Sequence, residues 1–327
     1  MKKSSKFLFT ILSLFKCPLR EMARENGKAH LSVYKLDILN EERLFQVLKV
    51  EMPTSCIHAA SLVIDRNSVH QPVEFIINNV QGTQCLLNAI RRTGTVQRLV
   101  FISTRSAVGE TQAAGDMTTE NDPLRPINPY GATKVAAEAL LHSFHKNFDL
   151  EVSICRMQPI YGPGGRRDMM PRLLLESAIY GKRIEKYGNG EAIRDWLYVG
   201  DAARGVLAAM NSSDGFSIFN FGTGVGTSLN QLIQLVSDIS GKKLNLVQKS
   251  TPAGDAVFAG ICDNRRAKEI LGWEPNIDLR TGLSIMYRLF HWLADPDNIK
   301  EYHDELKTLL TEDFHIIGSP FSKTSAR

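Results

Sequence analysis

Residues 30–155 alternate short apolar runs with amphipathic helical patterns, and this alternation constrains the fold more than any other feature of the sequence. The clearest apolar run, residues 99–102, is short enough for a strand buried on both faces. Helical patterns flank it at about residues 73–92 and 129–145. Such alternation is typical of a doubly wound α/β sheet, whose ligands bind beyond the carboxyl ends of the strands. We therefore expect a Rossmann-like parallel sheet with a ligand site at that edge.

The character of the sequence changes after residue 155, and this change predicts the domain organisation. Residues 30–155 are expected to form the Rossmann-like domain. Residues 156–294 are richer in glycine loops and turns. They are expected to form mainly a smaller substrate-binding domain, some of whose segments return to the sheet. An atypical segment, residues 1–29, precedes these domains, and a polar tail, residues 295–327, follows them.

The N-terminal segment has the charge order of a secretory signal, with Lys2, Lys3 and Lys6 before the apolar run 7–15. Residues 16–20 contain no pattern of small residues for signal cleavage, however, and the run is far shorter than the ~20 residues that span a bilayer. We therefore expect a cytoplasmic protein without a membrane span. A signal or anchor formed by residues 2–15 is the alternative.

The charge balance and the cysteines indicate the class of partner. The chain has 39 Lys and Arg against 35 Asp and Glu, so its net charge of +4 is too small to argue for a nucleic-acid surface. The 5 cysteines are widely spaced and lack CxxC or paired histidine patterns, so neither disulfides nor a metal site is expected. A small-molecule partner and a reducing compartment are therefore expected.

Tyr130 and Lys134 stand four residues apart at the start of the predicted helix 129–145, so they share one face of it. A lysine ammonium there favours the phenolate and should draw the pKa of Tyr130 down from about 10, as a general base requires. A chance pair on a solvated face is the alternative. Ser103 and Thr104 favour the catalytic interpretation, because they follow the buried strand, where a sheet delivers its active-site residues.

Together these residues resemble the extended short-chain dehydrogenase/reductase family, and within it the NAD-dependent nucleotide-sugar epimerases, over about residues 30–282. In that family a serine or threonine stands five residues before a glycine, as Thr104 does before Gly109. The resemblance implies that Thr104, Tyr130 and Lys134 are catalytic and that the cofactor is NAD. The cofactor-binding residues that it implies are Asp37, Ile38, Ala59, Ala60, Ser61, Asn79, Ser103, Tyr130, Lys134 and Pro159.

The second half of the chain is similar to UDP-glucuronate 4-epimerases and related enzymes of UDP-sugars. The similarity lies in residues 161–171, 187–190 and 194–196. The substrate-binding residues that it implies are Arg166, Arg194 and Asp255. Arg194 would hold the diphosphate, a role that suits a bidentate guanidinium. An ion pair of Arg194 with Asp195 or Asp201 is the structural alternative.

The sequence departs from the family at its start. The family opens with a strand, a G-x-x-G-x-x-G turn and a helix, whose glycines let backbone amides approach the pyrophosphate. Here Gly27 is the only glycine before Gly82, and residues 30–36 already suggest the third strand. The usual first strand and glycine loop are therefore expected to be missing or replaced by residues 1–26. A further departure is Pro159, where the family usually has asparagine.

The resemblance predicts an epimerase that oxidises C4 of a UDP-sugar or similar substrate to a 4-keto intermediate and reduces it again, with Tyr130 as the base. A dehydratase is disfavoured, because Arg105 and Ser106 stand where that branch has Asp-Glu. Two alternatives stay open. One is a catalytically impaired member that lacks the pyrophosphate loop, and the other is an oxidoreductase similar to 3β-hydroxysteroid dehydrogenases. The family also implies a possible homodimer, whereas the identity of the sugar is not predicted.

Overall fold

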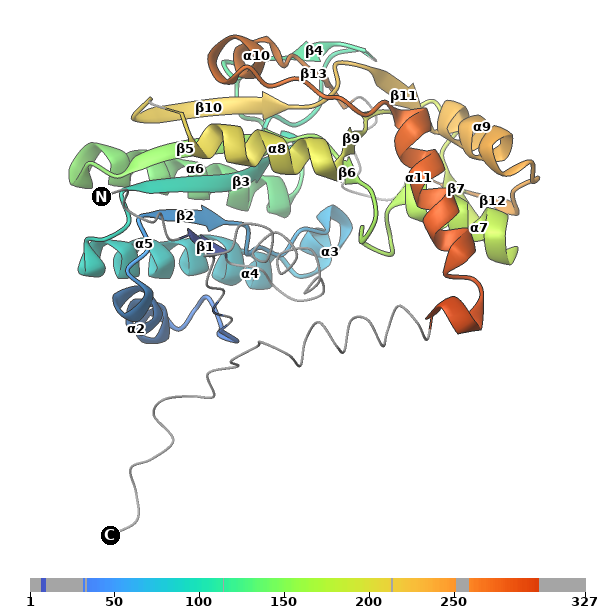
Figure 1. Cartoon of the computed structure of the whole chain (residues 1–327). Helices are drawn as coiled ribbons and strands as arrows, with labels where there is room; N and C mark the ends of the chain where they lie inside the picture. The colour runs from blue at the N-terminus through green and yellow to red at the C-terminus, as the bar shows by residue number, and fades with distance from the viewer. Residues whose placement is uncertain are drawn as a thin grey trace.

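A parallel sheet in the order β1-β2-β3-β5-β10 forms the centre of the structure, a computed structural model (Figure 1). Its strands are β1 (Phe7–Phe9), β2 (Ser55–His58), β3 (Arg98–Thr104), β5 (Glu151–Met157) and β10 (Phe216–Phe221). The structure describes the backbone of residues 7–9, and residues 32, 34–113, 115–212, 214–250 and 259–299. Most of residues 1–29 and 295–327, and the predicted site residue Asp255, lie outside the described residues.

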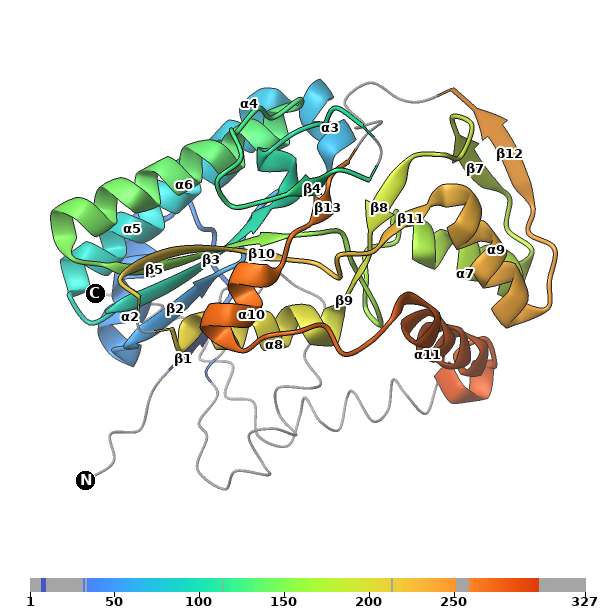
Figure 2. The same cartoon turned by 90° about the horizontal axis from the view of Figure 1, so that it is seen from above.

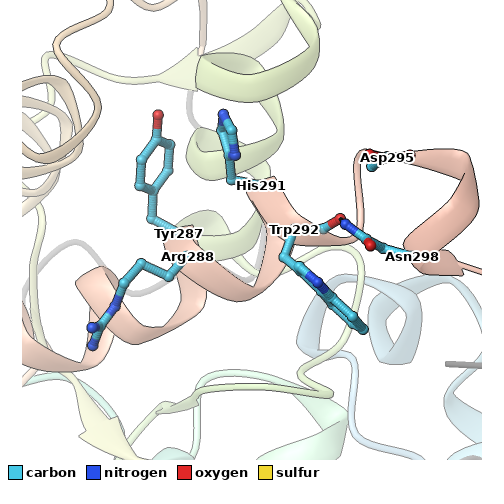
Figure 3. A pocket seen from close by; sticks show the side chains of 6 residues that line it. All are labelled: Tyr287, Arg288, His291, Trp292, Asp295 and Asn298. Carbon is cyan, nitrogen blue, oxygen red and sulfur yellow. Dashed lines mark hydrogen bonds between the residues drawn. The ribbon is translucent and has the colours of Figure 1, made fainter. Parts of the chain in front are cut away.

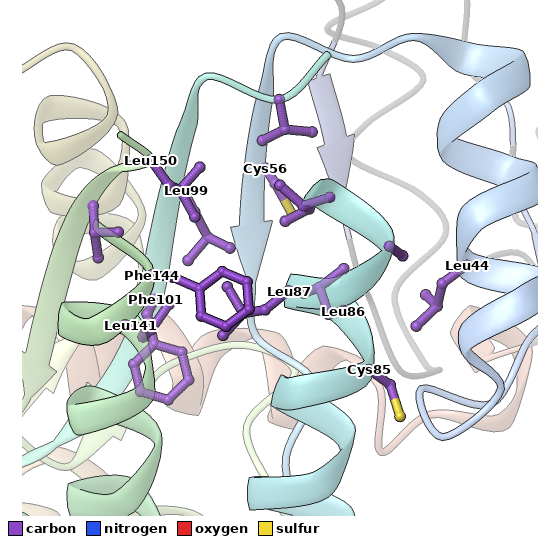
Figure 4. Packing of buried hydrophobic residues seen from close by; sticks show 14 of the residues in the cluster. Leu44, Cys56, Cys85, Leu86, Leu87, Leu99, Phe101, Leu141, Phe144 and Leu150 are labelled. Atoms are coloured by element: carbon purple, nitrogen blue, oxygen red, sulfur yellow. The ribbon is translucent and has the colours of Figure 1, made fainter. Parts of the chain in front are cut away.

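Strand β3 shows why the sheet is buried on both faces. Successive side chains of a strand point to opposite faces, so Leu99 and Phe101 enter one apolar cluster and Val100 enters another. All three are fully or almost fully buried. Figure 4 shows the first cluster, in which Leu99 and Phe101 meet leucines of the covering helices. The predicted strand at residues 99–102 therefore lies inside β3.

Helices cover both faces of the sheet (Figure 2). One layer packs on the face of Leu99 and Phe101, and its helices are α2 (Glu41–Glu51), α5 (Gly82–Thr93) and α6 (Pro129–Phe148). On the other face lie α8 (Val199–Met210) and α10 (Arg265–Leu271). The predicted doubly wound α/β fold is therefore confirmed.

A second lobe stands beyond the carboxyl ends of the strands and has its own apolar core, in which Leu174, Leu232 and Met286 are buried. Its helices are α7 (Met170–Tyr180), α9 (Leu229–Ser240) and α11 (Leu279–Trp292). Its paired strands are β7 (Ile184–Tyr187) with β12 (Leu246–Lys249) and β8 (Ile193–Asp195) with β11 (Gly226–Ser228). Two further pairs link the lobes: β4 (Met117–Thr118) with β13 (Ile261–Cys262), and β6 (Ile160–Tyr161) with β9 (Leu197–Tyr198).

Two predicted elements differ from the structure. No strand forms at residues 30–36 as far as they are described, namely at residues 32 and 34–36. Instead β1, within the atypical N-terminal segment, pairs with the edge of β2 that faces away from β3. The helix predicted over residues 73–92 is interrupted. It consists of α4 (Pro72–Phe75), a π-helical turn η1 (Ile76–Gln81) and α5. Within the described ranges, no helix combines the length and apolar character needed to cross a membrane.

Candidate active site

A cleft of about 1080 Å³ opens at the carboxyl edge of the sheet, between the sheet and the second lobe. The end of β3, the start of α6, the loop after β6 and the strands β7 and β8 contribute to its walls. Of the predicted site residues that the structure describes, Ser103, Thr104, Tyr130, Pro159, Arg166 and Arg194 line the cleft. The sheet edge predicted from the sequence is therefore where the largest concentration of candidate residues lies.

The start of α6 brings Tyr130 to Thr104. Asn128 caps this helix through its Oδ1, which accepts a hydrogen bond from the Gly131 backbone N–H at 2.9 Å. A Cβ atom at Gly131 would lie 2.3 Å from the backbone oxygen of Ser106, so only glycine lets the helix approach the loop after β3 this closely. The hydroxyl of Thr104 therefore lies close enough to the phenol of Tyr130 to favour the phenolate.

The pKa of Tyr130 shifts in the direction opposite to the one expected from the sequence. Burial raises the pKa of Tyr130 above its ordinary value of 10, and the negative charge of Asp65 adds to this effect. The nearby hydroxyl of Thr104 and the positive charge of Arg166 oppose this rise in pKa without reversing it. The predicted lowering of this pKa is therefore wrong for the chain alone, because desolvation of the phenolate outweighs the favourable contacts.

Lys134 is buried one helical turn from Tyr130. Its Nζ donates to the backbone oxygen of Ile102 at 2.8 Å and lies 4.6 Å from the centre of the Phe101 ring. Burial lowers the pKa of Lys134 to about 7, and the carboxylate of Glu138 opposes this shift. The ammonium is thus held at the end of β3, where its charge can change near neutral pH.

Glu138, four residues after Lys134, belongs to a buried network. Its carboxylate pairs with the guanidinium of Arg156, with Nη2 and Oε2 2.8 Å apart, and accepts a hydrogen bond from Ser103. Both partners of the ion pair are at most 5% exposed. Ser103 therefore lines the cleft while its hydroxyl donates to Glu138, which ties the end of β3 to α6.

Asn79 holds the loop after β2 against α6. Its side-chain amide accepts from the backbone N–H of Leu62 at 2.8 Å and donates to the backbone oxygen of the same residue at 3.0 Å. It also donates to Thr133, whose hydroxyl donates in turn to the backbone oxygen of Tyr130. The π-helical turn η1 thus brings this amide to the first turn of α6, immediately next to the Tyr130–Thr104 pair.

The chain matches a model of the NAD dependent epimerase/dehydratase family over residues 18–222. The chain belongs to this family. It is 32% identical to the UDP-glucuronate 4-epimerase of Thermodesulfobacterium geofontis over 79% of this chain and 78% of the relative. It is 30% identical to the UDP-glucose 4-epimerase of Mycolicibacterium smegmatis over 78% of this chain and 82% of the relative.

Solved structures agree with this membership. The UDP-glucose 4-epimerase of Thermotoga maritima with UDP-glucose has a TM-score of 0.76 at 32% identity and covers 80% of this chain and 85% of its own. The UDP-glucuronic acid 4-epimerase of Bacillus cereus with UDP-glucuronic acid and NAD has a TM-score of 0.74 at 28% identity, with coverages of 85% and 84%. The predicted resemblance to NAD-dependent epimerases of UDP-sugars is therefore confirmed.

Two residues, Gln158 in the cleft wall and the buried Lys134, have polar atoms that fit a cofactor, which in this family is NAD. Gln158, next to Pro159, donates through Nε2 to the Gly260 backbone oxygen. Its buried Oε1 has no hydrogen-bond partner among the described residues and is an acceptor available to a ligand's N–H. Lys134 has three donors, of which one is used by Ile102. No motif or spacing in the sequence marks Gln158 as a site residue.

Other predicted cofactor residues do not line this cleft. Asp37 accepts a hydrogen bond from the Leu39 backbone N–H at 2.9 Å in the turn before α2. Ile38 is buried beneath Gly82, where a Cβ atom would lie 2.7 Å from its side chain. Ala60 is buried and Ala59 exposed after β2, while the Ser61 hydroxyl donates to the Leu62 backbone oxygen. These residues therefore stand just after β2 and just before α2, outside the lining of the cleft.

On the substrate side, Arg194 lies on β8 and donates to the backbone oxygen of Ile193. The two carboxylates proposed as its ion-pair partners are held by other groups. Asp195 accepts hydrogen bonds from Thr223, Gly224 and Cys262, and Asp201 accepts from Arg204 and from the backbone N–H groups of residues 276 and 277. Neither carboxylate is recorded as an ion-pair partner of Arg194 among the described residues.

Arg166 connects the two sides of the cleft. Its guanidinium pairs with Asp168 at 2.9 Å, and its Nη1 donates to the backbone oxygen of Val63, also at 2.9 Å. Nearby, Arg66 of α3 (Asp65–His70) stacks on Tyr187 of β7, with its Cζ 4.4 Å from the ring centre. The helix α3, which the sequence analysis missed, therefore extends from the sheet side toward the second lobe.

A separate hollow of about 500 Å³ lies at the C-terminal end of α11 (Figure 3). Its walls are Tyr287, Arg288, His291, Trp292, Asp295 and Asn298. No predicted site residue within the described ranges lines this hollow, so the candidate chemistry is concentrated in the larger cleft.

Proposed function

We propose that the chain is an NAD-dependent 4-epimerase of a UDP-sugar or a closely similar nucleotide sugar. The placement of Thr104 and Tyr130 in one cleft carries this proposal, because they meet at the carboxyl edge of β3 with Lys134 one helical turn away. The curated relatives and solved structures named above as UDP-sugar epimerases support it.

Tyr130 takes the proton of the sugar C4 hydroxyl in this proposal. Thr104, which lines the cleft beside Tyr130, hydrogen-bonds that hydroxyl and orients it. Lys134 supplies positive charge next to Tyr130 and binds the ribose next to the nicotinamide. NAD, when bound, supplies the site that accepts and returns hydride. Because burial raises the pKa of Tyr130 in the chain alone, positive charge in the cleft has to increase before the phenol can give up its proton.

The remaining assignments follow the family. We assign the diphosphate to Arg194, and further substrate contacts to Arg166 and Asp255. The cofactor-binding role is assigned to Asp37, Ile38, Ala59, Ala60, Ser61, Asn79, Ser103 and Pro159. For Asn79 and Ser103 the side-chain bonds to α6 support a positioning role, through the first turn of α6 and through Glu138.

The Tyr130→Phe variant tests the proposed function. Purified protein is incubated with NAD and either UDP-glucose or UDP-glucuronate, and the C4 epimer is separated by chromatography. We expect the wild-type chain to form the epimer and Tyr130→Phe to lose at least about 100-fold in kcat, since a positioned acid or base contributes about 10² to 10⁴. Affinity for UDP should be retained, because Arg194 is unchanged.

The control is Tyr287→Phe, which removes a phenol on α11 outside the cleft and should leave kcat unchanged. Failure of the wild-type chain to bind NAD even at millimolar concentration would favour the catalytically impaired alternative. Equal turnover by Tyr130→Phe and the wild type would remove Tyr130 from the mechanism.

We also propose a cytoplasmic homodimer. The four cysteines that the structure describes are free thiols, which suits a reducing compartment. Exposed apolar side chains lie on α4 and η1 next to α6, namely Val73, Ile76 and Ile77, and burying such a group is a common basis of self-association. Light scattering that gives the mass of one chain at micromolar concentration would contradict the dimer.

A further inference from the structure

Arg105 places a cation directly after Thr104. It begins the short 3-10 turn η2 (Arg105–Ala107), and its half-buried side chain lines the cleft. Its Nη2 donates to the backbone oxygen of Gly109 at 2.8 Å. This bond uses one of the five N–H groups of a guanidinium and pairs it with a neutral acceptor. The proposed function gives Arg105 no role in the cleft.

A second guanidinium, that of Arg194, lies within electrostatic reach of Arg105. Burial and the positive charge of Arg194 lower the pKa of Arg105 to about 10. Asp65 and Glu110 oppose this shift, yet the pKa stays below its ordinary value. Bringing two like charges together in a partly desolvated cleft is unfavourable, and a negatively charged ligand group relieves the repulsion. Both guanidinium groups line the same cleft, so the cleft favours an anionic ligand.

The proposed function fixes which ligand group lies near each of them. It places the diphosphate at Arg194 and the C4 hydroxyl at Thr104 and Tyr130. In a hexose, C4 is bonded to C3 and C5. C3 carries a hydroxyl in neutral and acidic sugars alike, whereas C5 carries C6, which is a neutral hydroxymethyl group in a hexose and a carboxylate in a uronate. The group on the sugar that can supply a charge beside Thr104 is therefore the one at C6.

We propose that Arg105 is a specificity-determining residue that binds a carboxylate at C6 of the sugar and so selects a nucleotide uronate over the neutral hexose. This inference rests on the proposed function for the placement of C4. A guanidinium suits the task, because its planar donors can bind both oxygens of a carboxylate.

Dissociation constants measured by calorimetry test this inference. UDP-glucuronate, UDP-glucose and UDP are titrated into the full chain in the presence of NAD. We expect the wild-type chain to bind UDP-glucuronate at least tenfold more tightly than UDP-glucose. Arg105→Ser should abolish this preference while changing the affinities for UDP-glucose and UDP less than twofold. Arg105→Lys should keep part of the preference, because it retains the charge and loses the planar donors.

The matched control is Arg91→Ser, which removes an exposed arginine on α5 outside the cleft and should reproduce the wild-type affinities. Two results would overturn the inference: a wild-type chain without the preference, or an Arg105→Ser variant that keeps it. A parallel loss of UDP affinity would also overturn it, by assigning Arg105 to the diphosphate.

The affinities separate this inference from the proposed function. A chain that binds the UDP-sugars and does not interconvert them contradicts the epimerase, while the preference for UDP-glucuronate still decides the role of Arg105. Failure to bind any of the three ligands overturns both. Thermal unfolding of each variant verifies that it is folded.

Discussion

At the residue scale, Lys134 links the candidate site to the stability of the fold. Burial lowers its pKa from 10.5 to about 7, so the folded chain binds this proton less tightly than the unfolded chain does. Between these two values the unfolded state carries more protons, and the free energy of unfolding rises with pH. We expect the ligand-free wild type to gain about 1 kcal/mol per pH unit relative to Lys134→Met between pH 7 and 9.

Urea unfolding of both proteins at pH 7, 8 and 9 measures this difference. Methionine removes the titrating group and keeps a long apolar side chain in the buried position, so other ionisable groups cancel in the comparison. Lys35→Met, on a residue outside the cleft, serves as the control and should run parallel to the wild type. If the Lys134→Met curve is also parallel to the wild type, the ammonium is not desolvated as the structure indicates.

At the scale of the elements, the contact between α6 and η2 determines the geometry of the site. Alanine ordinarily stabilises a helix by about 0.5–1 kcal/mol relative to glycine. At Gly131 the added Cβ would meet a backbone oxygen at 2.3 Å, which cannot move aside as a side chain can. We expect Gly131→Ala to destabilise the chain by about 1–3 kcal/mol and to lower kcat, because Tyr130 moves away from Thr104.

Gly200→Ala is the matched control in α8, where a Cβ would lie 3.2 Å from a ring carbon of Tyr198. Its unfolding midpoint in urea should stay close to that of the wild type. Gly131→Ala with unchanged stability and kcat would show that α6 and η2 do not need this close approach.

The elements also show how far the sequence predicts the fold. The apolar run at residues 99–102 and the helical pattern at 129–145 lie within β3 and α6, because burial on both faces and helical periodicity are local signals. Which strand pairs with β2 on the side opposite β3 cannot be predicted from a local pattern. The short strand β1 pairs with it, while the described residues of 30–36 form no strand. The π-helical turn at Asn79 likewise interrupts a pattern that is regular in the sequence.

The same distinction applies to the candidate site. Thr104, Tyr130 and Lys134 are recognisable from their spacing and their place after a strand. The proximity of Arg105 to Arg194 depends on how β8 of the second lobe meets the end of β3, which no local pattern encodes. The raised pKa of Tyr130 is a consequence of burial and was equally inaccessible to the sequence.

At the scale of the whole molecule, the cleft joins two lobes with separate apolar cores, so a ligand that contacts both stabilises them together. UDP at about 100 times its dissociation constant should raise the free energy of unfolding of the wild type by about 2.7 kcal/mol. If Arg194 binds the diphosphate, Arg194→Gln should bind UDP at least tenfold more weakly. The stabilisation at the same UDP concentration then falls by about 1.4 kcal/mol.

Arg280→Gln changes an arginine of α11 that pairs with Asp238 outside the cleft, and it should retain the full stabilisation. Thermal unfolding with and without UDP makes the comparison, and an equal shift in Arg194→Gln and the wild type would return Arg194 to a structural role.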